Sequence, residues 1–369
     1  MAPQRYALIL VDVSQGLLMF RLIRFAIFAC VSSALLAAQT PAAKPTPASN
    51  AQAAPAADTN AALAEARRLA QQGKYDEAIA KLHALAAKSP KPAGVSHELG
   101  MAYYKKADYL KAAEYLKQAT AENPDDKEAV QLLGLSYYLA GRPAEAIPYL
   151  EKVQTWYPRA NVDASYVLGI SYIQNKDYPN ARKAFATMFD VPPESGAAYL
   201  VTARMLFRQE FLPIAEEYAQ KAIVADSKLP LAHQLLGEVH MYMSKIPEAI
   251  SDFQQELAIN PANAAVYYKL GDAYSRVQKY DDAQRQLQRS LWLDASATGP
   301  YILMGKVLEK QGEPVLALRT LQRAANMDPN NPMTHQLLGQ AYRDMGKSDD
   351  AERELKAAEQ LRNQQSEPQ

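Results

Sequence analysis

The sequence predicts an all-α protein built as a solenoid of antiparallel helix pairs, and three observations lead to this fold class. The stretch "GKYDEAIAKL" at 73–82 recurs in altered form along the chain, with a period of 34 residues. Within each period, small and large apolar residues alternate at helical spacing. A proline closes most periods, and it ends a helix because it lacks the backbone N–H. Nine units fill 59–365, with starts at 59, 93, 127, 162, 196, 230, 264, 298 and 332.

The segment before the repeats predicts export. Residues 19–40 place Arg21 and Arg24 ahead of an apolar run and then small residues, which is the order of a secretory signal. The apolar run is shorter than the about 20 residues that a membrane-spanning helix needs. We therefore expect residues 1–38 to be a signal region that is cleaved near its end, so that no integral membrane span is left.

Two alternatives stay open in this segment. Translation starts at Met1 or at Met19, and in the second case residues 1–18 are an upstream extension of the reading frame. Cys30 would be the lipidated residue if the protein were a lipoprotein. Residues 39–58 are rich in alanine and proline and predict a disordered linker. The predicted location is the periplasm or another space outside the cytoplasm of a bacterium.

Two positions of each repeat carry small residues, which allow two helices to approach closely. Position 8, on the first helix, is Ala66, Gly100, Gly134, Gly169, Ala203, Gly237, Gly271, Gly305 and Gly339. Position 20, on the second helix, is Ala78, Ala112, Ala146, Ala181, Ala215, Ala249, Ala283, Ala317 and Ala351. We expect the alanine at position 20 to face the small residue at position 8.

This pattern, with tyrosine common at position 11, leucine or phenylalanine at position 24 and proline at position 32, resembles the tetratricopeptide repeat family. The resemblance covers 59–365 and leaves 366–369 as a tail. It implies a right-handed superhelix whose first helices line a concave groove. Departures from the family pattern are Ala66 and Ala203 at position 8 and Glu256 at position 27, where a small residue is usual.

Charge and composition exclude several classes of function. Forty basic and 40 acidic side chains cancel, so the chain has no broad positive field for nucleic acid. His233 and His240 share a helix face, but no acidic residue or cysteine joins them at the spacing of a metal site. His97 lacks a paired nucleophile or carboxylate. We therefore expect a protein that is not an enzyme and that has no cofactor and no metal.

The groove positions 2, 5, 9 and 12 change from apolar and tyrosine-rich in the first half to mixed charge in the second. This surface predicts a scaffold that binds a protein partner or an extended peptide, with aromatic anchors and orienting charges. The alternative is an accessory protein for polysaccharide or envelope assembly, with tyrosines stacked on sugar rings. The oligomeric state stays open. The predicted groove residues are His97, Met101, Tyr104, Gln131, Leu135, Tyr138, Tyr166, Ile170, Ile173, Arg204, Phe207, Tyr268 and Arg276.

Overall fold

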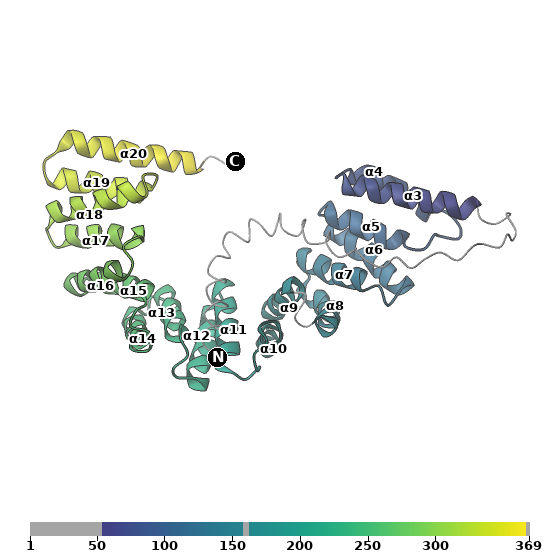
Figure 1. Cartoon of the computed structure of the whole chain (residues 1–369), viewed down its shortest axis with the longest axis horizontal. Helices are drawn as coiled ribbons and strands as arrows, with labels where there is room; N and C mark the ends of the chain where they lie inside the picture. Colours follow the sequence, from purple (N-terminus) through teal and green to yellow (C-terminus); the bar gives the residue numbers. More distant parts are fainter. Residues whose placement is uncertain (1–53, 158–161, 367–369) are drawn as a thin grey trace, which may run out of the picture. The chain divides into compact units, whose positions relative to one another are not determined.

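The structure is a computed structural model that describes residues 54–157 and 162–366. The predicted signal region, its two alternative starts, Cys30, most of the predicted linker and residues 367–369 lie outside this part. In the described residues eighteen helices form nine antiparallel pairs, and no strand is present (Figure 1). The prediction of an all-α solenoid of helix pairs is confirmed.

Each pair consists of a first helix, a short turn and a second helix. The first helices are α3 (Ala54–Gln71), α5 (Val95–Lys105), α7 (Lys127–Leu139), α9 (Val162–Gln174), α11 (Gly196–Arg208), α13 (Ala232–Tyr242), α15 (Ala264–Arg276), α17 (Thr298–Lys310) and α19 (Pro332–Asp344). The second helices are α4 (Tyr75–Ala86), α6 (Tyr109–Glu122), α8 (Pro143–Trp156), α10 (Tyr178–Phe189), α12 (Leu212–Ala225), α14 (Ile246–Ile259), α16 (Tyr280–Leu293), α18 (Pro314–Met327) and α20 (Ser348–Ser366).

Helix α3 starts earlier than the sequence predicts. It begins at Ala54, so the prediction of a disordered linker was wrong for residues 54–58. The alanines of this stretch have the highest helix propensity of any residue. Pro55 is the second residue of the helix, where its missing N–H removes no hydrogen bond within the helix.

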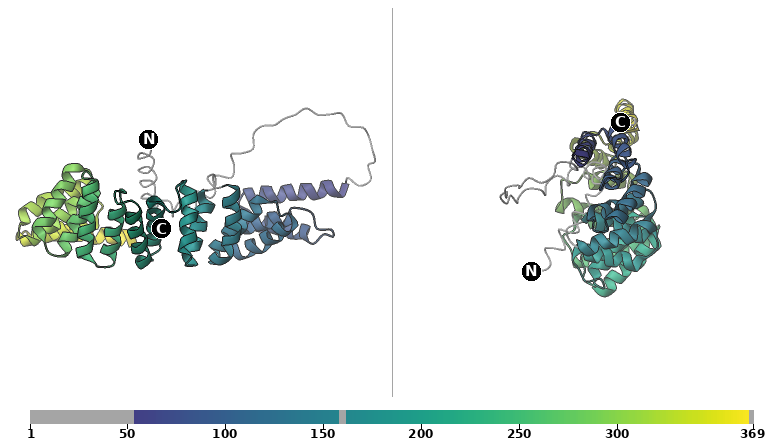
Figure 2. Two further views of the ribbon diagram at one scale, coloured as in Figure 1. Left: turned by 90° about the horizontal axis from the view of Figure 1, so that it is seen from below. Right: turned by 90° about the vertical axis from the view of Figure 1, so that its right-hand side faces the viewer.

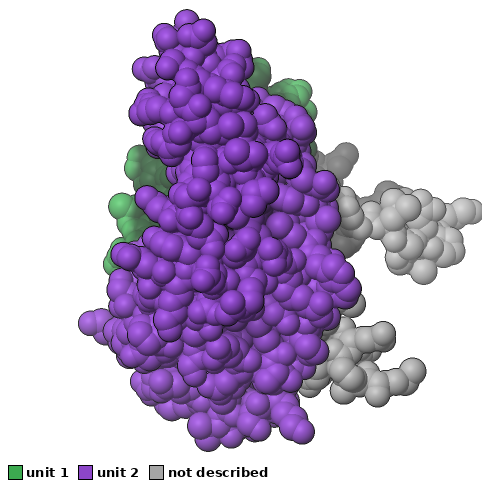
Figure 3. Space-filling model, turned by 90° about the vertical axis from the view of Figure 1, so that its left-hand side faces the viewer, with its two compact units in different colours: residues 1–168 green, residues 169–369 purple. Residues whose placement is uncertain are grey.

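The chain divides into two compact units, and the division in the sequence falls between Leu168 and Gly169 (Figure 3). Within each unit a second helix packs against the first helix of its own repeat and of the next, as α6 does with α7 and α12 with α13 (Figure 2). Neighbouring first helices also contact each other, for example α5 with α7 and α17 with α19. Among the helices described here, neighbouring second helices contact each other less than neighbouring first helices do. Each unit therefore curves with its first helices on the inner face.

The apolar core runs from one repeat into the next. One buried cluster joins Phe253 on α14 to Leu270 on α15, and another joins Leu287 on α16 to Met304 and Val307 on α17. A single helix pair therefore cannot bury its apolar side chains without its neighbour, which is the packing logic of a repeat protein.

The small residue at position 8 is covered by a different residue from the one predicted. A Cβ added to Gly134 would lie 2.9 Å from the Cγ of Leu150, which occupies position 24 of the same repeat. At Gly305 the Cβ would lie 2.5 Å from the Cγ of Leu321, also at position 24. The position 20 alanine also faces this site, since its backbone oxygen would lie 3.4 Å from a Cβ on Gly271 and 3.2 Å from a Cβ on Gly339 in their own repeats, but the nearest side chain is that of position 24. Glycine is needed at position 8 because a large side chain sits directly on its backbone.

The fifth repeat replaces the glycine and leucine of this contact with two alanines. Its position 8 is Ala203 and its position 24 is Ala219, and both are completely buried. The extra methyl group on the first helix is matched by the smaller side chain on the second. The departure that the sequence showed at Ala203 is therefore compensated within the same repeat, whereas Ala66 in the first repeat keeps Leu82 at position 24.

Glu256, the second departure from the family pattern, caps a neighbouring helix. It lies on α14, is completely buried, and accepts hydrogen bonds from the backbone N–H groups of Leu231 at 2.9 Å and Gln234 at 3.4 Å. Helix α13 has no cap from its own N-cap side chain, since Leu231 occupies that position. Burial raises the pKa of the Glu256 carboxyl, while the two backbone N–H groups oppose this rise.

The turn between the two helices of every repeat contains one residue with positive φ. Four of these nine turns use glycine, as at Gly141, and the other five use a residue with a side chain. A left-handed conformation costs a non-glycine residue about 1 kcal/mol. The five non-glycine positions are Ala107, Lys176, Glu210, Ser244 and Gln278.

We expect Gln278→Gly to raise the free energy of unfolding by about 1 kcal/mol, because glycine adopts this backbone conformation without steric cost. Gln278→Ala is the matched control and should leave stability unchanged, since alanine meets the same steric cost as glutamine. Urea denaturation of the three proteins measures the difference. Equal stability of the glycine and alanine variants would contradict this account of the turn.

Candidate functional site

The inner face of the first unit, formed by α5, α7 and the start of α9, carries partly exposed apolar side chains. Met101 and Leu135 lie at position 9 of their repeats, and Tyr104 and Tyr138 lie one turn further along the same helices. Each of these side chains is half-buried, and so are Gln131 and Tyr166. The structure therefore leaves these predicted groove residues open to solvent on one face, while residues such as Leu99 and Leu133 on the opposite sides of the helices are buried.

The tyrosines of this face lie in surroundings of low polarity. Burial, with smaller contributions from Tyr109 and Asp163, raises the pKa of Tyr104 to about 12. Burial raises the pKa of Tyr138 as well, with a contribution from Tyr166. A phenol that is partly exposed and yet poorly solvated is suited to stack on, or pack against, an incoming apolar group.

His97 is paired with carboxylates, so the expectation that it lacks one was wrong. Its Nδ1 lies 2.6 Å from Oδ2 of Asp126, and its Nε2 lies 3.7 Å from Glu128. The other oxygen of Asp126 accepts the backbone N–H of Ala129 and caps helix α7. The histidine therefore ties α5 to the N-terminus of α7, and this structural role accounts for its position on the inner face.

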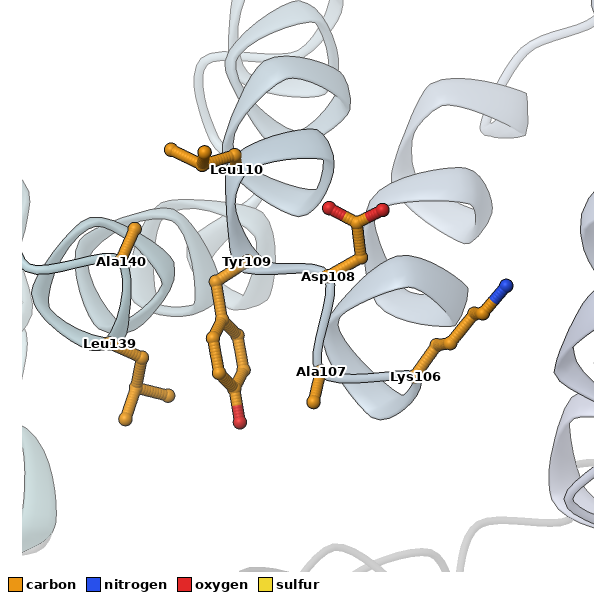
Figure 4. A pocket seen from close by; sticks show the side chains of 7 residues that line it. All are labelled: Lys106, Ala107, Asp108, Tyr109, Leu110, Leu139 and Ala140. Atoms are coloured by element: carbon orange, nitrogen blue, oxygen red, sulfur yellow. The ribbon is translucent and has the colours of Figure 1, made fainter.

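A shallow hollow adjoins this face at the turn of the second repeat (Figure 4). It is lined in part by Tyr109, whose ring makes an edge contact with Tyr104 at 5.7 Å between centroids. Leu139 lies beside Tyr109 in Figure 4, and Leu110 is 59% exposed at the rim. The hollow therefore extends the apolar surface of Tyr104 toward the turns.

In the second unit, two predicted groove residues are not available for binding. Ile170 is 1% exposed and Ile173 is completely buried. Their placement in a groove was wrong, because both side chains are enclosed in the packed interior and present no surface to a ligand. Side-chain type and repeat position did not distinguish them from Met101 and Leu135, which stay half-exposed.

Arg204 and Phe207 on α11 are partly exposed, as predicted for the inner face. The Nε of Arg204 is buried and has no hydrogen-bond partner, and burial lowers the pKa of this guanidinium. Phe207 meets the ring of Tyr242 edge-on, with centroids 5.0 Å apart. Tyr242 is 74% exposed and was not among the predicted residues, because it lies at position 13 of its repeat, one residue beyond the expected stripe.

Further along the second unit the inner-face charges form local pairs. Glu238 lies 3.3 Å from Lys269 and accepts a hydrogen bond from Gln234 at 2.8 Å. Arg276 is paired at 3.0 Å with Asp272 of the same helix, so its charge is compensated. The half-buried Tyr268 lies near that pair, and burial followed by the charge of Asp272 raises the pKa of this phenol.

Glu309 on α17 is an exception to this pairing. One carboxylate oxygen of Glu309 is buried without a hydrogen-bond partner. Burial, followed by the negative charge of Asp344 on α19, raises the pKa of Glu309 from the ordinary 4.5 to about 7, and Lys310 lowers it slightly. Asp344 itself accepts a hydrogen bond from Gln340. The sequence shows a glutamate at position 12, but not that a second carboxylate lies beside it.

This raised pKa predicts how stability depends on pH. The protonated form of Glu309 is favoured in the folded state, so its contribution is complete below pH 4.5 and is lost as the pH rises through about 7. Glu309→Gln should therefore stabilise the protein at pH 8 and have little effect at pH 4. Because Glu309 is partly exposed, solvent screening limits the gain to roughly 1–2 kcal/mol. The exposed Glu352 provides the control substitution. Parallel stability curves for wild type and Glu309→Gln would contradict the assignment.

Two histidines of the second unit, His233 and His240, are buried, and His240 contacts carboxylates of the neighbouring helices. The Nδ1 of His240 lies 2.6 Å from Asp252 and its Nε2 lies 3.1 Å from Glu216, which also pairs with Lys245 at 2.9 Å. His240 therefore has two carboxylate partners on other helices, which the sequence pattern did not identify. His233 is also buried, and burial lowers its pKa. Over the described ranges, no group of three or more histidine, cysteine, aspartate or glutamate side chains is arranged to hold a metal ion.

None of the helices described here is both long and apolar enough to cross a membrane. The inner faces of the two units carry the charges and aromatic residues described above. Their best-defined features are the tyrosines of the first unit and the unpaired charges of the second.

Comparison with known families matches repeat models along most of the chain. One model described as "Tetratricopeptide repeat" matches residues 97–164 and 268–332, and a second with the same description matches 137–205 and 308–369. A model described as "TPR repeat" matches 237–278.

Individual relatives are distant. Protein bimA of Emericella nidulans is 23% identical over 193 residues, which are 52% of this chain and 24% of that protein. The chain thus spans about a quarter of the length of this curated relative. Among solved structures, MamA is 22% identical with a TM-score of 0.42, over 44% of this chain and 96% of that one. YrrB, described as a TPR protein with an unusual peptide-binding site, is 23% identical with a TM-score of 0.43, over 49% and 93%.

Proposed function

The chain belongs to the tetratricopeptide repeat family, and from this we propose that it is an exported scaffold that binds an extended segment of a partner protein along its inner face. Proteins of this family typically mediate protein–protein interaction and are generally not catalytic. The curved faces of such repeat arrays are extended binding surfaces.

One observation carries this proposal. Met101, Tyr104, Leu135 and Tyr138 stay half-exposed on one face of the first unit, although each is large enough to be buried in a core. A contiguous apolar face of this kind usually marks an interaction site. Because thioether and aliphatic side chains lie among the tyrosines, the face suits the mixed side chains of a peptide better than sugar rings, which need many hydrogen-bonding partners.

Selection from a library of random displayed peptides tests the binding proposal. We expect the full chain to enrich peptides, and the double variant Tyr104→Ser, Tyr138→Ser to lose most of their binding while it keeps its helical circular dichroism. Val224→Ser, an 87% exposed apolar residue on the second helix α12, is the matched control and should bind as wild type does. Retention of glycans but not peptides on parallel arrays would favour the polysaccharide alternative instead.

The proposal of export rests on the order of charges and apolar residues in 19–40, which lies outside the described residues. Fractionation of a bacterium that expresses the chain, with N-terminal sequencing of the product, tests it. A mature N-terminus near residue 39 in the periplasmic fraction supports export, a terminus at Cys30 indicates lipidation, and an uncleaved chain in the cytoplasm argues against both.

A further inference from the structure

Two opposite charges on the inner face of the second unit each contain a buried polar atom that has no partner among the described residues. These atoms are the Nε of Arg204 on α11 and the Oε1 of Glu309 on α17. Glu238 and Asp272, which lie on the helices between them, are already compensated by Lys269 and Arg276. Arg204 and Glu309 therefore differ from Glu238 and Asp272, each of which has an ion-pair partner of opposite charge.

An unpaired, poorly solvated charge destabilises the protein that contains it, so its presence calls for an explanation. Neither group caps a helix, and the charge of Glu238 on α13 opposes the effect of burial on Arg204 only in part. We propose that they are the two charge anchors of a peptide site, in which Arg204 pairs with an acidic side chain of the bound segment and Glu309 pairs with a basic one. This inference rests on the proposed function and specifies the chemistry of its ligand.

The surroundings of each anchor agree with this assignment. The edge-to-face pair of Phe207 and the exposed Tyr242 lies beside Arg204, which favours an apolar or aromatic residue next to the acidic one. At the other end Asp344 adds a second carboxylate beside Glu309, and two carboxylates together favour a lysine or arginine. The opposite signs of the two ends fix the direction in which the segment binds.

The distance between the anchors sets the spacing of the two charges in the ligand. Arg204 lies in the fifth repeat and Glu309 in the eighth, so three steps from one first helix to the next separate them. With about 10 Å for each step between packed helices, the separation is roughly 30 Å. An extended chain advances about 3.3 Å per residue, so the acidic and basic residues of the ligand should be roughly nine positions apart.

This assignment predicts opposite effects on stability and on binding. Arg204→Gln and Glu309→Gln each remove an unpaired charge, so the melting temperature of the free protein should stay equal or rise. The same substitutions remove one ion pair from the complex, so peptide affinity should fall by about tenfold or more. Residues that merely supported the fold would lower stability and affinity together.

The experiment uses the purified full chain and a library of random peptides long enough to span both anchors. We expect the enriched peptides to carry an acidic and a basic residue at roughly the spacing above. One such peptide, labelled for fluorescence anisotropy, is then measured against wild type, Arg204→Gln and Glu309→Gln. Arg285→Gln is the matched control, because Arg285 lies on the second helix α16, is 66% exposed and is paired with Asp282 of its own helix; its affinity should be unchanged.

A double-mutant cycle assigns each pair. When the acidic residue of the peptide is replaced by its amide, affinity for wild type should fall, but affinity for Arg204→Gln should fall no further. If enriched peptides bind all variants equally, the anchor assignment is wrong while peptide binding stands. If wild type enriches no peptide, the proposed function fails and this inference fails with it.

Discussion

Gly305→Ala is expected to lower the free energy of unfolding by about 1–3 kcal/mol, although it adds only one methyl group. The added Cβ would lie 2.5 Å from Cγ and 2.6 Å from Cδ2 of Leu321, which is completely buried. Leu321→Ala alone should cost about 2–5 kcal/mol through the cavity that it leaves. The double variant should cost less than the sum, because it reproduces the buried pair of Ala203 and Ala219 that the fifth repeat already uses.

Urea denaturation of the two single variants and the double variant measures this coupling. Asn326→Ala, an exposed position on the same helix α18 as Leu321, is the control and should change stability by less than about 0.5 kcal/mol. Strictly additive costs would show that the residues at positions 8 and 24 do not pack on each other.

Glu256→Ala is expected to destabilise the protein by about 3 kcal/mol, since it leaves the buried N–H groups of Leu231 and Gln234 without an acceptor and opens a cavity. Glu256→Gln should cost less, because one amide oxygen still accepts a hydrogen bond and the volume is kept. Amide hydrogen exchange at Leu231 and Gln234, measured beside denaturation, locates the effect at the start of α13.

Gln255→Ala provides the comparison for this site. Gln255 is the neighbouring residue, is exposed, and hydrogen-bonds only to Ser251 one turn earlier. We expect no change in exchange at Leu231 in this variant. Unaltered exchange at Leu231 in Glu256→Ala would mean that the carboxylate does not cap α13.

Most of the fold could be predicted from the sequence because the information is periodic. A small residue at position 8 and an alanine at position 20 occur in all nine repeats, and a proline at position 32 occurs in six of them. These are local features, and they set the register without any knowledge of contacts. The predicted site was less complete. Met101, Tyr104, Leu135 and Tyr138 are partly exposed on the inner face, but Ile170 and Ile173 are buried. Exposure at a given repeat position depends on the side chains that surround it in the folded structure, which the repeat pattern does not encode.

The pairing of charges was also missed, for a related reason. Asp126 lies 29 residues after His97 in the chain and 2.6 Å from it in space. Glu256 likewise lies 25 residues from the backbone group that it caps. Residues about one repeat apart in sequence are neighbours in a solenoid, but the rotamers and the angle between helices select which of several acidic residues makes the contact.

The amino-acid sequence was sufficient for the class of fold and the register of the nine repeats, whereas the position of the first helices as the inner layer was implied by the family resemblance. The fold class and the register are local properties. These properties follow from helix periodicity and from the size of side chains, which act over one or two turns. Contacts between repeats established which inner-face residues stay accessible, which charges are matched, and that Arg204 and Glu309 each keep a buried atom without a partner. Solvation and pairing of a charge depend on every element packed around it, so they exist only once the helices have been brought together.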